Sequence, residues 1–437
     1  MSDSISRVVA ITAVVVLFAT GMALAEQPVP YKLENGLTVI LCPVPAAQDV
    51  AVVVLLNLGA DRDPAGKSGR AHLLEHLYCT AAAGDAPIQD FAAIQKRYGA
   101  GYNEQTGFDF TVLAGVVKPE QLAEELKDAA ARMSDLHITD ADLKREVPRV
   151  LLELGNMYGG IPALAGINHV RTLLHPAPQG GRYGGSAEHV QAITLSELQQ
   201  SWSDYYKPKN AVLVLAGRFD AAAARKLIEQ HFAPISAGKA LPAAPPTPEV
   251  KAGATHRISV KPVMQDAPGV VCVGYAAPPP GSRDYAPFLL AVSRLWALSQ
   301  GGFQPGQPQP VFYPPLDDPT TIALQAPLPP GTDAEPILAQ LDQCLRSALA
   351  PKIEPKDRLL AVNSMMMPLG TGDVPDAMWV QNTYGLAFAA GRQYQMKMDG
   401  KKLRDAIERV TAADVQRLSK AVFAPTQRIA VIVEVAK

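Results

Sequence analysis

Two apolar runs near the start of the chain, residues 36–41 and 50–58, have the length and the β-branched content of strands, with a turn between them. Residues 103–117 form a third strand-like run. Helices are expected to begin near Ser68 and at the segment Thr139–Asp142. These elements do not alternate strictly as strand, helix, strand. The pattern therefore predicts the α+β class, with mixed sheets on which helices pack.

The two halves of the chain end in the same order of elements. Residues 193–199 (ITLSELQ) match residues 410–416 (VTAADVQ) at an offset of 217, and each segment has a Thr followed three residues later by an acid, as in a capping box. At the same offset Pro208 corresponds to Pro425, and a strand-like run follows in both. The order helix, Pro, strand is common, so a chance match is the alternative. We expect an internal duplication that gives two homologous α/β-sandwich domains.

A stretch rich in Pro and Ala separates the halves. Residues 236–248 read SAGKALPAAPPTP, which is typical of a semi-rigid spacer. We therefore expect a first domain over residues 26–235, a linker over 236–252 and a second domain over 253–437.

The first 25 residues differ from the rest of the chain. Arg7 is followed by an almost wholly apolar run at residues 8–19, and Ala23–Ala25 fits the small-x-small cleavage pattern. Residues 1–25 are therefore predicted to be a signal peptide, which implies an exported protein, periplasmic if the source is a bacterium. The alternative is an uncleaved N-terminal anchor, because the uncharged run is only slightly short of a membrane span.

The composition of the chain excludes some classes of function. The net charge is −2, from 40 Lys and Arg and 42 Asp and Glu, so nothing indicates binding to nucleic acid. No later stretch is long and apolar enough to span a bilayer, so none is expected in the mature chain. The four cysteines have no C-x-x-C spacing, which argues against a cysteine zinc site, and Cys42 and Cys272 are expected to be buried thiols.

Residues 72–76 read HLLEH and carry the most informative chemistry of the chain. Positions i and i+4 of a helix lie on one face, so His72 and His76 can bind one Zn²⁺ ion. Glu75 lies beside them and can accept a proton from a water molecule at that ion. The motif H-x-x-E-H is the inverzincin signature. A catalytic zinc site needs three protein ligands, so a third ligand must come from elsewhere.

The spacing from the HLLEH motif to two later acids, Glu146 and Glu153, resembles that of a known family. In the pitrilysin/insulysin family of zinc metallopeptidases, H-x-x-E-H is followed by 76 residues and a Glu, with another acid seven residues before that Glu. Here residues 77–152 separate His76 from Glu153, and Glu146 precedes Glu153 by seven. Size and duplication resemble the shorter bacterial and mitochondrial-processing-peptidase-like members.

The resemblance implies a role for each residue of this set. His72, His76 and Glu153 would hold one zinc ion per chain. Glu75 would be the general base that takes a proton from water and passes it to the leaving amine. Glu146 would orient a ligand without binding the metal.

A second segment resembles the family's substrate strand. Residues 99–106 (GAGYNEQT), with Asp109 after them, look like the strand that pairs with an extended peptide. The resemblance implies that Asn103 and Thr106 contact the substrate. A turn residue is the alternative interpretation of Asn103.

Two departures from the family affect this expectation. Pro148 lies between the two acids, where a kink could displace Glu153. The family also has an Arg and a Tyr seven residues apart in its second half, which help to hold the substrate. In residues 300–318 Tyr313 could be that Tyr, but position 306 is Gly. We therefore expect a homologous partner subunit to supply the pair, and the alternative is a homodimer with weak or lost activity.

Two functions remain open at this point. The first is an exported zinc endopeptidase that hydrolyses unfolded peptides. The second is a non-catalytic core or scaffold subunit of a processing-peptidase-like complex. The intact HLLEH motif favours the first, and the missing Arg/Tyr pair is compatible with the second.

Overall fold

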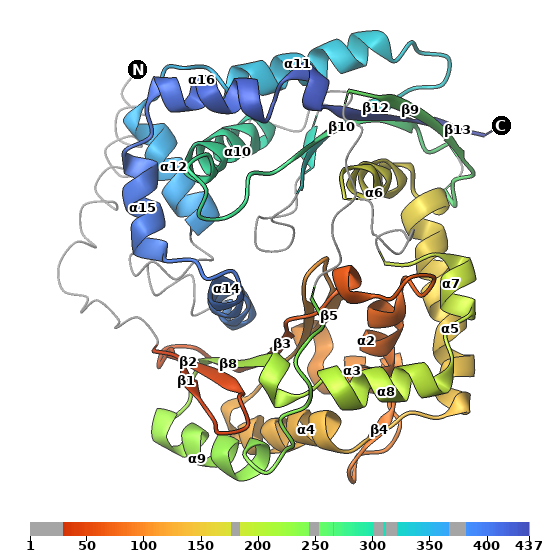
Figure 1. Ribbon diagram of the computed structural model, residues 1–437, viewed down its shortest axis with the longest axis vertical. Helices are drawn as coiled ribbons and strands as arrows, with labels where there is room; N and C mark the ends of the chain where they lie inside the picture. Colours follow the sequence, from red (N-terminus) through yellow and green to blue (C-terminus); the bar gives the residue numbers. More distant parts are fainter. Residues whose placement is uncertain are drawn as a thin grey trace, which may run out of the picture.

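The chain folds into two α/β units that face each other, each built around one mixed sheet (Figure 1). The computed structural model describes residues 29–175, 184–243, 253–264, 266–300, 309–311, 321–366 and 382–436. The expected signal peptide and part of the expected linker lie outside these residues. The mixed sheets and packed helices confirm the predicted fold class.

The first sheet has the strand order β1-β2-β8-β3-β6-β5. β2 and β8 are parallel, and the other neighbouring pairs are antiparallel. Every residue of β3 is buried, which explains why its sequence, VAVVVLL, is a continuous apolar run. The strands are β1 (Tyr31–Lys32), β2 (Thr38–Pro43), β3 (Val50–Leu56), β5 (Tyr102–Thr106), β6 (Thr111–Val117) and β8 (Ala211–Gly217). β4 (Ala82–Ala83) and β7 (Leu136–His137) form a separate short pair.

The second sheet has the order β11-β12-β10-β13-β9 and repeats the pairing of the first. β9 and β13 are parallel, as β2 and β8 are, and the neighbouring strands are antiparallel. The two strand orders therefore match from β2-β8-β3-β6-β5 to β9-β13-β10-β12-β11, as the proposed duplication requires. The strands are β9 (Thr255–Val260), β10 (Gly269–Ala276), β11 (Gln309–Val311), β12 (Thr321–Leu328) and β13 (Ile429–Val435).

The order of the helices along the chain is also similar in the two halves. Thr194 and Thr411 each close a capping box, with Glu197 and Asp414 as the acids, as the matched sequences predict. The first half contains α2 (Arg70–Thr80), α3 (Phe91–Tyr98), α4 (Leu122–Ser134), α5 (Asp140–Gly155), α6 (Pro162–Leu174), α7 (Ala187–Gln191), α8 (Leu195–Tyr205) and α9 (Ala221–Phe232). The second contains α10 (Tyr285–Gln300), α11 (Glu335–Ala348), α12 (Pro355–Met366), α14 (Thr383–Gln395), α15 (Gly400–Glu408) and α16 (Ala412–Ala421).

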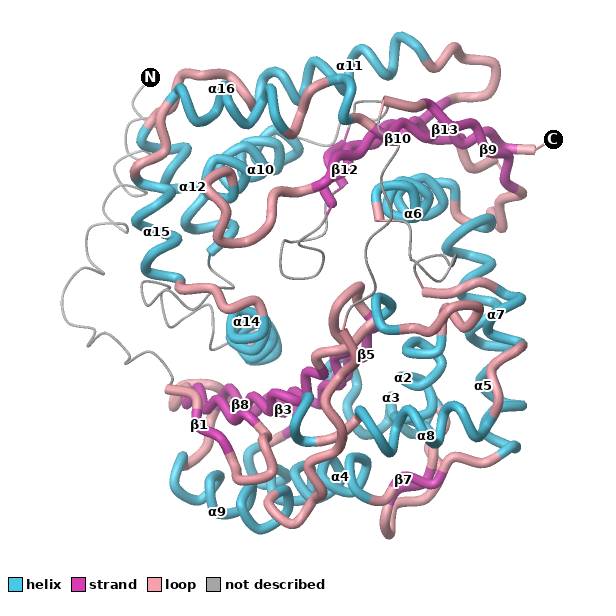
Figure 2. Tube along the Cα trace, in the orientation of Figure 1, coloured by secondary structure: helices cyan, strands magenta, loops and turns pink. Residues whose placement is uncertain are grey.

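One helix of each half packs on the sheet of the other half, which the sequence did not predict. α6 lies against β10, β12 and β13, and α14 lies against β3 and β8 (Figures 1 and 2). Glycines permit the close approach at both places. A Cβ atom on Gly166 of α6 would lie 3.2 Å from Cys272 Cβ, and one on Gly391 of α14 would lie 2.1 Å from Leu55 Cδ1. Each sheet is thus covered on one face by its own helices and on the other by an exchanged helix.

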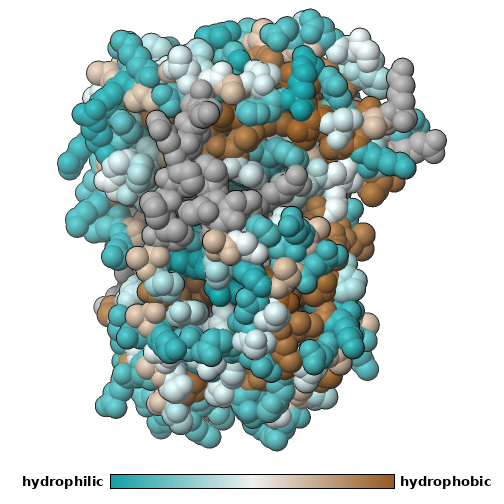
Figure 3. Space-filling model, turned by 45° about the vertical axis from the view of Figure 1, so that its right-hand side comes forward, coloured by the Kyte–Doolittle hydropathy of each residue, from teal (hydrophilic) through white to brown (hydrophobic). Residues whose placement is uncertain are grey.

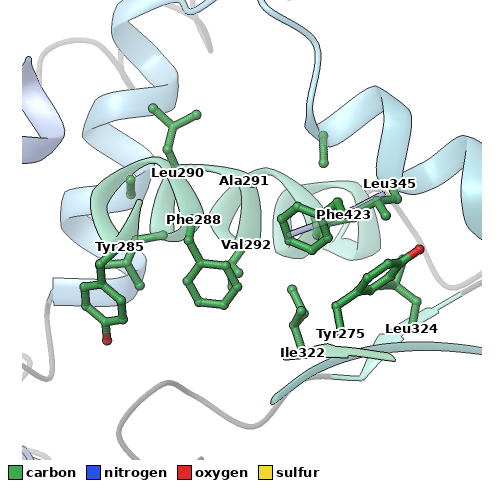
Figure 4. Packing of buried hydrophobic residues seen from close by; sticks show 14 of the residues in the cluster. Tyr275, Tyr285, Phe288, Leu290, Ala291, Val292, Ile322, Leu324, Leu345 and Phe423 are labelled. Carbon is green, nitrogen blue, oxygen red and sulfur yellow. The ribbon is translucent and has the colours of Figure 1, made fainter. Parts of the chain in front are cut away.

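The core of the second half is apolar. Phe288 of α10 stacks on Phe423, and Tyr275 of β10 meets the same Phe423 ring edge-on (Figure 4). Cys42, Cys79 and Cys272 are buried free thiols and Cys344 is a partly buried one, which confirms the prediction for Cys42 and Cys272.

Hydrophilic side chains dominate the surface in Figure 3, with apolar residues exposed in separate clusters.

Among the described residues no individual helix has the length and apolarity needed to cross a membrane. Only a bent pair, Asp140–Gly160 with Pro162–Leu174 at 94°, meets those two criteria together.

Candidate active site

The HLLEH segment forms the middle of α2, and a buried aspartate fixes where this helix begins. Asp63 accepts hydrogen bonds from the backbone N–H groups of Gly69 at 2.7 Å and Ala71 at 2.9 Å. Gly69 has φ +91°, and a Cβ atom there would lie 2.7 Å from Val190 Cγ2, so glycine is required. Burial raises the pKa of Asp63 to about 7, although Arg70 and the backbone N–H groups act in the opposite direction. Asp63 therefore sets the register of the helix that carries both histidines.

The structure brings His72, His76 and Glu153 together around a common point. Glu153 Oε2 on α5 lies 3.3 Å from His72 Nε2 and 3.5 Å from His76 Nε2. Two ligand atoms bound tetrahedrally to the same zinc at 2.0–2.1 Å lie about 3.3–3.4 Å apart. The spacing of these three atoms therefore fits one zinc ion. The side chain of Glu153 is 49% exposed, whereas those of the histidines are about 10% exposed, so the site opens to solvent on the Glu153 side.

The other ring nitrogen of each histidine faces an acceptor. His72 Nδ1 lies 3.0 Å from the carbonyl oxygen of Gly184, and His76 Nδ1 lies 3.5 Å from Glu146 Oε2. Because the Nδ1 atom of each ring faces an acceptor, the Nε2 atom, which faces Glu153, is the nitrogen left to bind a metal ion. Both histidines thus present the same nitrogen to the candidate metal position.

Glu146 is fully buried and is held by two arginines of its own helix. Arg145 Nε donates to Glu146 Oε1 at 2.8 Å and Arg149 Nη1 donates to the same oxygen at 2.9 Å. Burial would raise the pKa of Glu146, but hydrogen bonds from His76 and Arg145 lower it to about 2. Glu146 is therefore a fixed anion beside His76.

The electrostatic field of the site favours a cation. Burial alone would lower the pKa of His76, but the hydrogen bonds to Glu146 and Glu153 raise it to about 10. Hydrogen bonds from His72 and His76 likewise lower the pKa of Glu153 despite its partial burial. Carboxylates that stabilise a proton on an imidazole also stabilise a divalent ion at the same place. The donor set therefore fits zinc in charge as well as in spacing.

Glu75 occupies a different position from Glu153. It is 4% exposed, and one of its carboxylate oxygens accepts a hydrogen bond from Thr106 of β5. One ligand atom from each of His72, Glu75 and His76 falls within 4.8 Å of the others, so Glu75 lies beside the candidate metal position. Glu153 Oε2 lies within 3.5 Å of both Nε2 atoms, so the geometry is compatible with the prediction that Glu153 is the third ligand. Burial raises the pKa of Glu75 to about 7, against the opposing charge of His72.

The expected effect of Pro148 is not seen. α5 runs unbroken from Asp140 to Gly155 with Pro148 inside it, and a π-helical turn follows at Asn156–Gly160. Glu146 and Glu153 consequently share the face that meets α2. The helix therefore accommodates Pro148 without moving Glu153 away from the histidines.

Strand β5, at the end of the first sheet, carries both expected substrate residues: Thr106 contacts Glu75 of the cluster, whereas Asn103 contacts Tyr384 instead. Gly107 N donates to Phe110 O at 2.8 Å, so pairs 105/112 and 103/114 are also the hydrogen-bonded pairs of this antiparallel ladder. The backbone groups of Tyr102, Glu104 and Thr106 therefore point to the open edge. An extended peptide can add to β5 as a further strand there.

Sequence reasoning missed several residues around the site. Glu104 contributes to the raised pKa of Glu75 and accepts a hydrogen bond from Tyr102 OH at 2.8 Å. Its position two residues before Thr106 on the same strand face was the available signal. Asp63 was signalled only by the Gly-rich loop before the helix. Nothing in the sequence pointed to Tyr384, whose hydroxyl accepts a hydrogen bond from Asn103 Nδ2.

Cys79, His137 and His169 are not part of the cluster formed by His72, Glu75 and His76. Cys79 is buried, and burial raises the pKa of its thiol, which disfavours the reactive thiolate. His137 Nε2 lies 3.3 Å from Asp135, and His169 Nδ1 faces the carbonyl of Ala165. The positions 306 and 313 of the expected Arg/Tyr pair lie outside the described residues.

The chain is similar to known peptidases and peptidase-like proteins. Residues 192–295 match the family described as Peptidase M16 inactive domain, a region that contains none of the seven candidate site residues. A zinc protease, PqqE of Helicobacter pylori, is 27% identical over 243 residues, 52% of this chain and 53% of that protein. The chain's matches span about half the length of the first such relatives.

Solved structures share the fold over nearly the whole chain. A protease from Helicobacter pylori superposes with a TM-score of 0.76 at 21% identity, over 93% of this chain and all of that one. The periplasmic protease PqqL from Escherichia coli gives a TM-score of 0.68 at 14% identity, over 95% of this chain and 48% of that one. Together with the matched domain family and the zinc-protease relatives, these likenesses support the M16 peptidase family, in agreement with the resemblance to pitrilysin and insulysin.

Proposed function

We propose that this protein is an exported zinc metalloendopeptidase that hydrolyses unfolded peptides, with one zinc ion per chain. The observation that carries the proposal is the position of Glu153 Oε2, within 3.5 Å of both His72 Nε2 and His76 Nε2. Three protein ligands with an exposed side match the needs of a catalytic zinc site. The naming of relatives as zinc proteases, one of them periplasmic, supports the same proposal.

The residues of the chain have separate tasks in this reaction. His72, His76 and Glu153 hold the ion, and Glu146 keeps the His76 ring in place. When bound, zinc lowers the pKa of a water molecule to about 7 and polarises the scissile carbonyl. Glu75, held by Thr106, accepts the proton of the attacking water and delivers it to the leaving amine.

The peptide would be held by its backbone. The outward N–H and C=O groups of Tyr102, Glu104 and Thr106 bind an extended segment, which is how a strand edge selects unfolded rather than folded substrates. The strand direction brings the peptide past Glu75, because Thr106 is the residue that contacts it.

A second function has one observation in its favour. Position 306 is Gly, so the expected Arg/Tyr pair is missing from the sequence. A homologous partner subunit, or a second copy of the chain, would complete the substrate site in the peptidase proposal. In the alternative, the chain is a non-catalytic core subunit of a processing-peptidase-like complex.

One set of measurements separates these proposals. Zinc content and cleavage of a quenched unstructured peptide are measured for the wild type, Glu75→Gln, Glu153→Gln and, as a surface control, Glu120→Gln. The peptidase proposal expects stoichiometric zinc in the wild type and control, zinc without cleavage in Glu75→Gln, and loss of zinc in Glu153→Gln. Stoichiometric zinc without cleavage, alone and mixed with a homologous chain, would instead assign the core-subunit role.

A further inference from the structure

Helix α14 belongs to the second half of the chain, yet several of its side chains contact the first sheet. Tyr384, in its first turn, accepts a hydrogen bond from Asn103 of β5. Arg392, two turns further on, donates to Asp109 Oδ1 at 2.8 Å. Asp109 lies in the turn between β5 and β6, so α14 contacts both the candidate substrate strand and the turn that ends it.

The Arg392 contact is strongly fixed. Its side chain is fully buried, its guanidinium lies 4.2 Å from the centre of the Phe110 ring, and Nη1 donates to Gln395 Oε1 at 2.7 Å. Phe110 in turn meets Phe388 of α14 with ring centres 5.6 Å apart. The β5–β6 hairpin is therefore held by α14 at its turn.

The two faces of β5 have different neighbours. Asn103 is paired across the ladder with Ala114, which belongs to the core that includes α14 residues. Glu104 is paired with Leu113, which belongs to the core beneath α2. A peptide added to β5 would accordingly have the zinc ligands on one face and α14 on the other, and its side chains would alternate between them.

The position of the Asn103 amide follows from its contact with Tyr384. An Asn side chain has two N–H donors and one carbonyl acceptor at its end. One N–H directed at the Tyr384 hydroxyl fixes the plane of the amide and therefore the direction of its carbonyl oxygen. Both side chains are only partly buried, as a substrate-facing pair must be.

We propose that Tyr384 is a positioning residue for peptide binding, because it orients Asn103 on the open edge of the first sheet. This inference rests on the proposed function and adds to it that the second half of the same chain shapes the peptide site. Tyr384 acts through Asn103 and takes no part in the proton transfers of Glu75.

The test measures peptide binding by the full chain. Glu75→Gln is used as the background so that the probe, fluorescein-labelled casein, is bound without being cut. In this background Tyr384→Phe keeps the ring and its packing on Phe388 and removes only the hydroxyl. Loss of one hydrogen bond predicts binding weakened about 2–10-fold, with unchanged zinc content. Tyr394→Phe is the matched control, because its hydroxyl is on the same helix but accepts from Thr38, on β2.

A double-mutant cycle separates positioning from a general structural effect. With Asn103→Ala already present, Tyr384→Phe should weaken binding no further, because its action passes through that amide. Additive effects, or equal binding by the Tyr384→Phe and Tyr394→Phe chains, would overturn the inference alone. If no version of the chain binds the probe, the peptide site of the proposed function fails together with it.

Discussion

The two halves of this protein have the same strand order, but among the residues that the structure describes the candidate metal ligands gather in the first half. After β3 of the first sheet comes α2, which carries His72, Glu75 and His76. After the equivalent strand β10 comes α10, whose Phe288, Leu289 and Val292 fill an apolar core. The shared pattern of buried strands is thus sufficient for the fold, and a few polar residues in one copy are sufficient for the site.

The second half contacts the first sheet through a buried charge. The fully buried Arg392 forms an ion pair with Asp109, in the turn between β5 and β6. The exchange of α6 and α14 means that neither sheet is fully covered by its own half. The halves therefore differ in the polar residues that they carry, whereas the packing of each sheet depends on a helix from the other half.

The largest expected effect is on the chemistry of the first half. Glu75→Gln should lower the rate of peptide hydrolysis about 10²–10⁴-fold, because the amide cannot accept the proton of water. Zinc content should remain stoichiometric, since Glu75 is assigned no ligand role. A rate within threefold of the wild type would remove Glu75 from the mechanism. Hydrolysis of a quenched peptide and metal analysis of the same sample provide the two measurements.

A smaller effect is expected from the residue behind His76. Glu146→Gln should weaken zinc affinity about 10–100-fold, the range found when the partner of a ligating histidine is removed. Competition with a chelator of known affinity measures it. Glu124→Gln, an acid at the start of α4, is the control and should leave zinc affinity unchanged. An unchanged affinity in Glu146→Gln would show that the two arginines, and not His76, account for the buried acid.

The exchanged helices offer a test on stability. Gly391→Ala places a methyl group 2.1 Å from Leu55 Cδ1, the end of a flexible side chain, so the free energy of unfolding should fall on the order of 1 kcal/mol. Gly155→Ala is the matched change, because a Cβ atom at this helical position meets nothing within 4 Å. It should be neutral or slightly stabilising. Urea unfolding that ranks the two variants in the opposite order would contradict the packing of α14 on β3.

The smallest effect concerns a charge present in only one half. Lys207 is buried and donates to Met133 O at 2.6 Å, whereas the residue 217 positions later is Ala424. Burial lowers the pKa of Lys207 to about 8. Between about pH 8 and the unfolded pKa of about 10.4 the unfolded state binds more protons, so this lysine makes stability rise with pH.

Comparison with Lys207→Met isolates that contribution. The wild type should gain stability relative to the variant from pH 8 to pH 10, and the contact of the ammonium group with the Trp202 ring, which favours the charged form, makes this gain smaller than the lowered pKa alone implies. Urea unfolding at several pH values measures the difference. Parallel curves would show that Lys207 stays protonated throughout this range.

The two histidines could be predicted from the sequence because their geometry is local, whereas Glu153 and Glu146 were predicted only through the resemblance to a known family. His72 and His76 share a face of one helix, and Glu146 and Glu153 share a face of another. Only one contact between the helices is then needed to complete the set. Pro148 could not be judged in the same way, since its effect depends on whether neighbouring packing keeps α5 continuous.

The sequence by itself determined the fold class and the repeat, and it singled out the residues proposed to bind zinc, because hydrophobic periodicity and residue spacing are properties of short segments. The tertiary structure alone decided that α6 and α14 cross to the opposite sheets, that Glu153 lies near both Nε2 atoms, and that Tyr384 meets Asn103, 281 residues away. An apolar helix face specifies that it will be buried, but not against which sheet. Many surfaces satisfy the same hydrophobic pattern, and only the packing of the whole chain selects one of them.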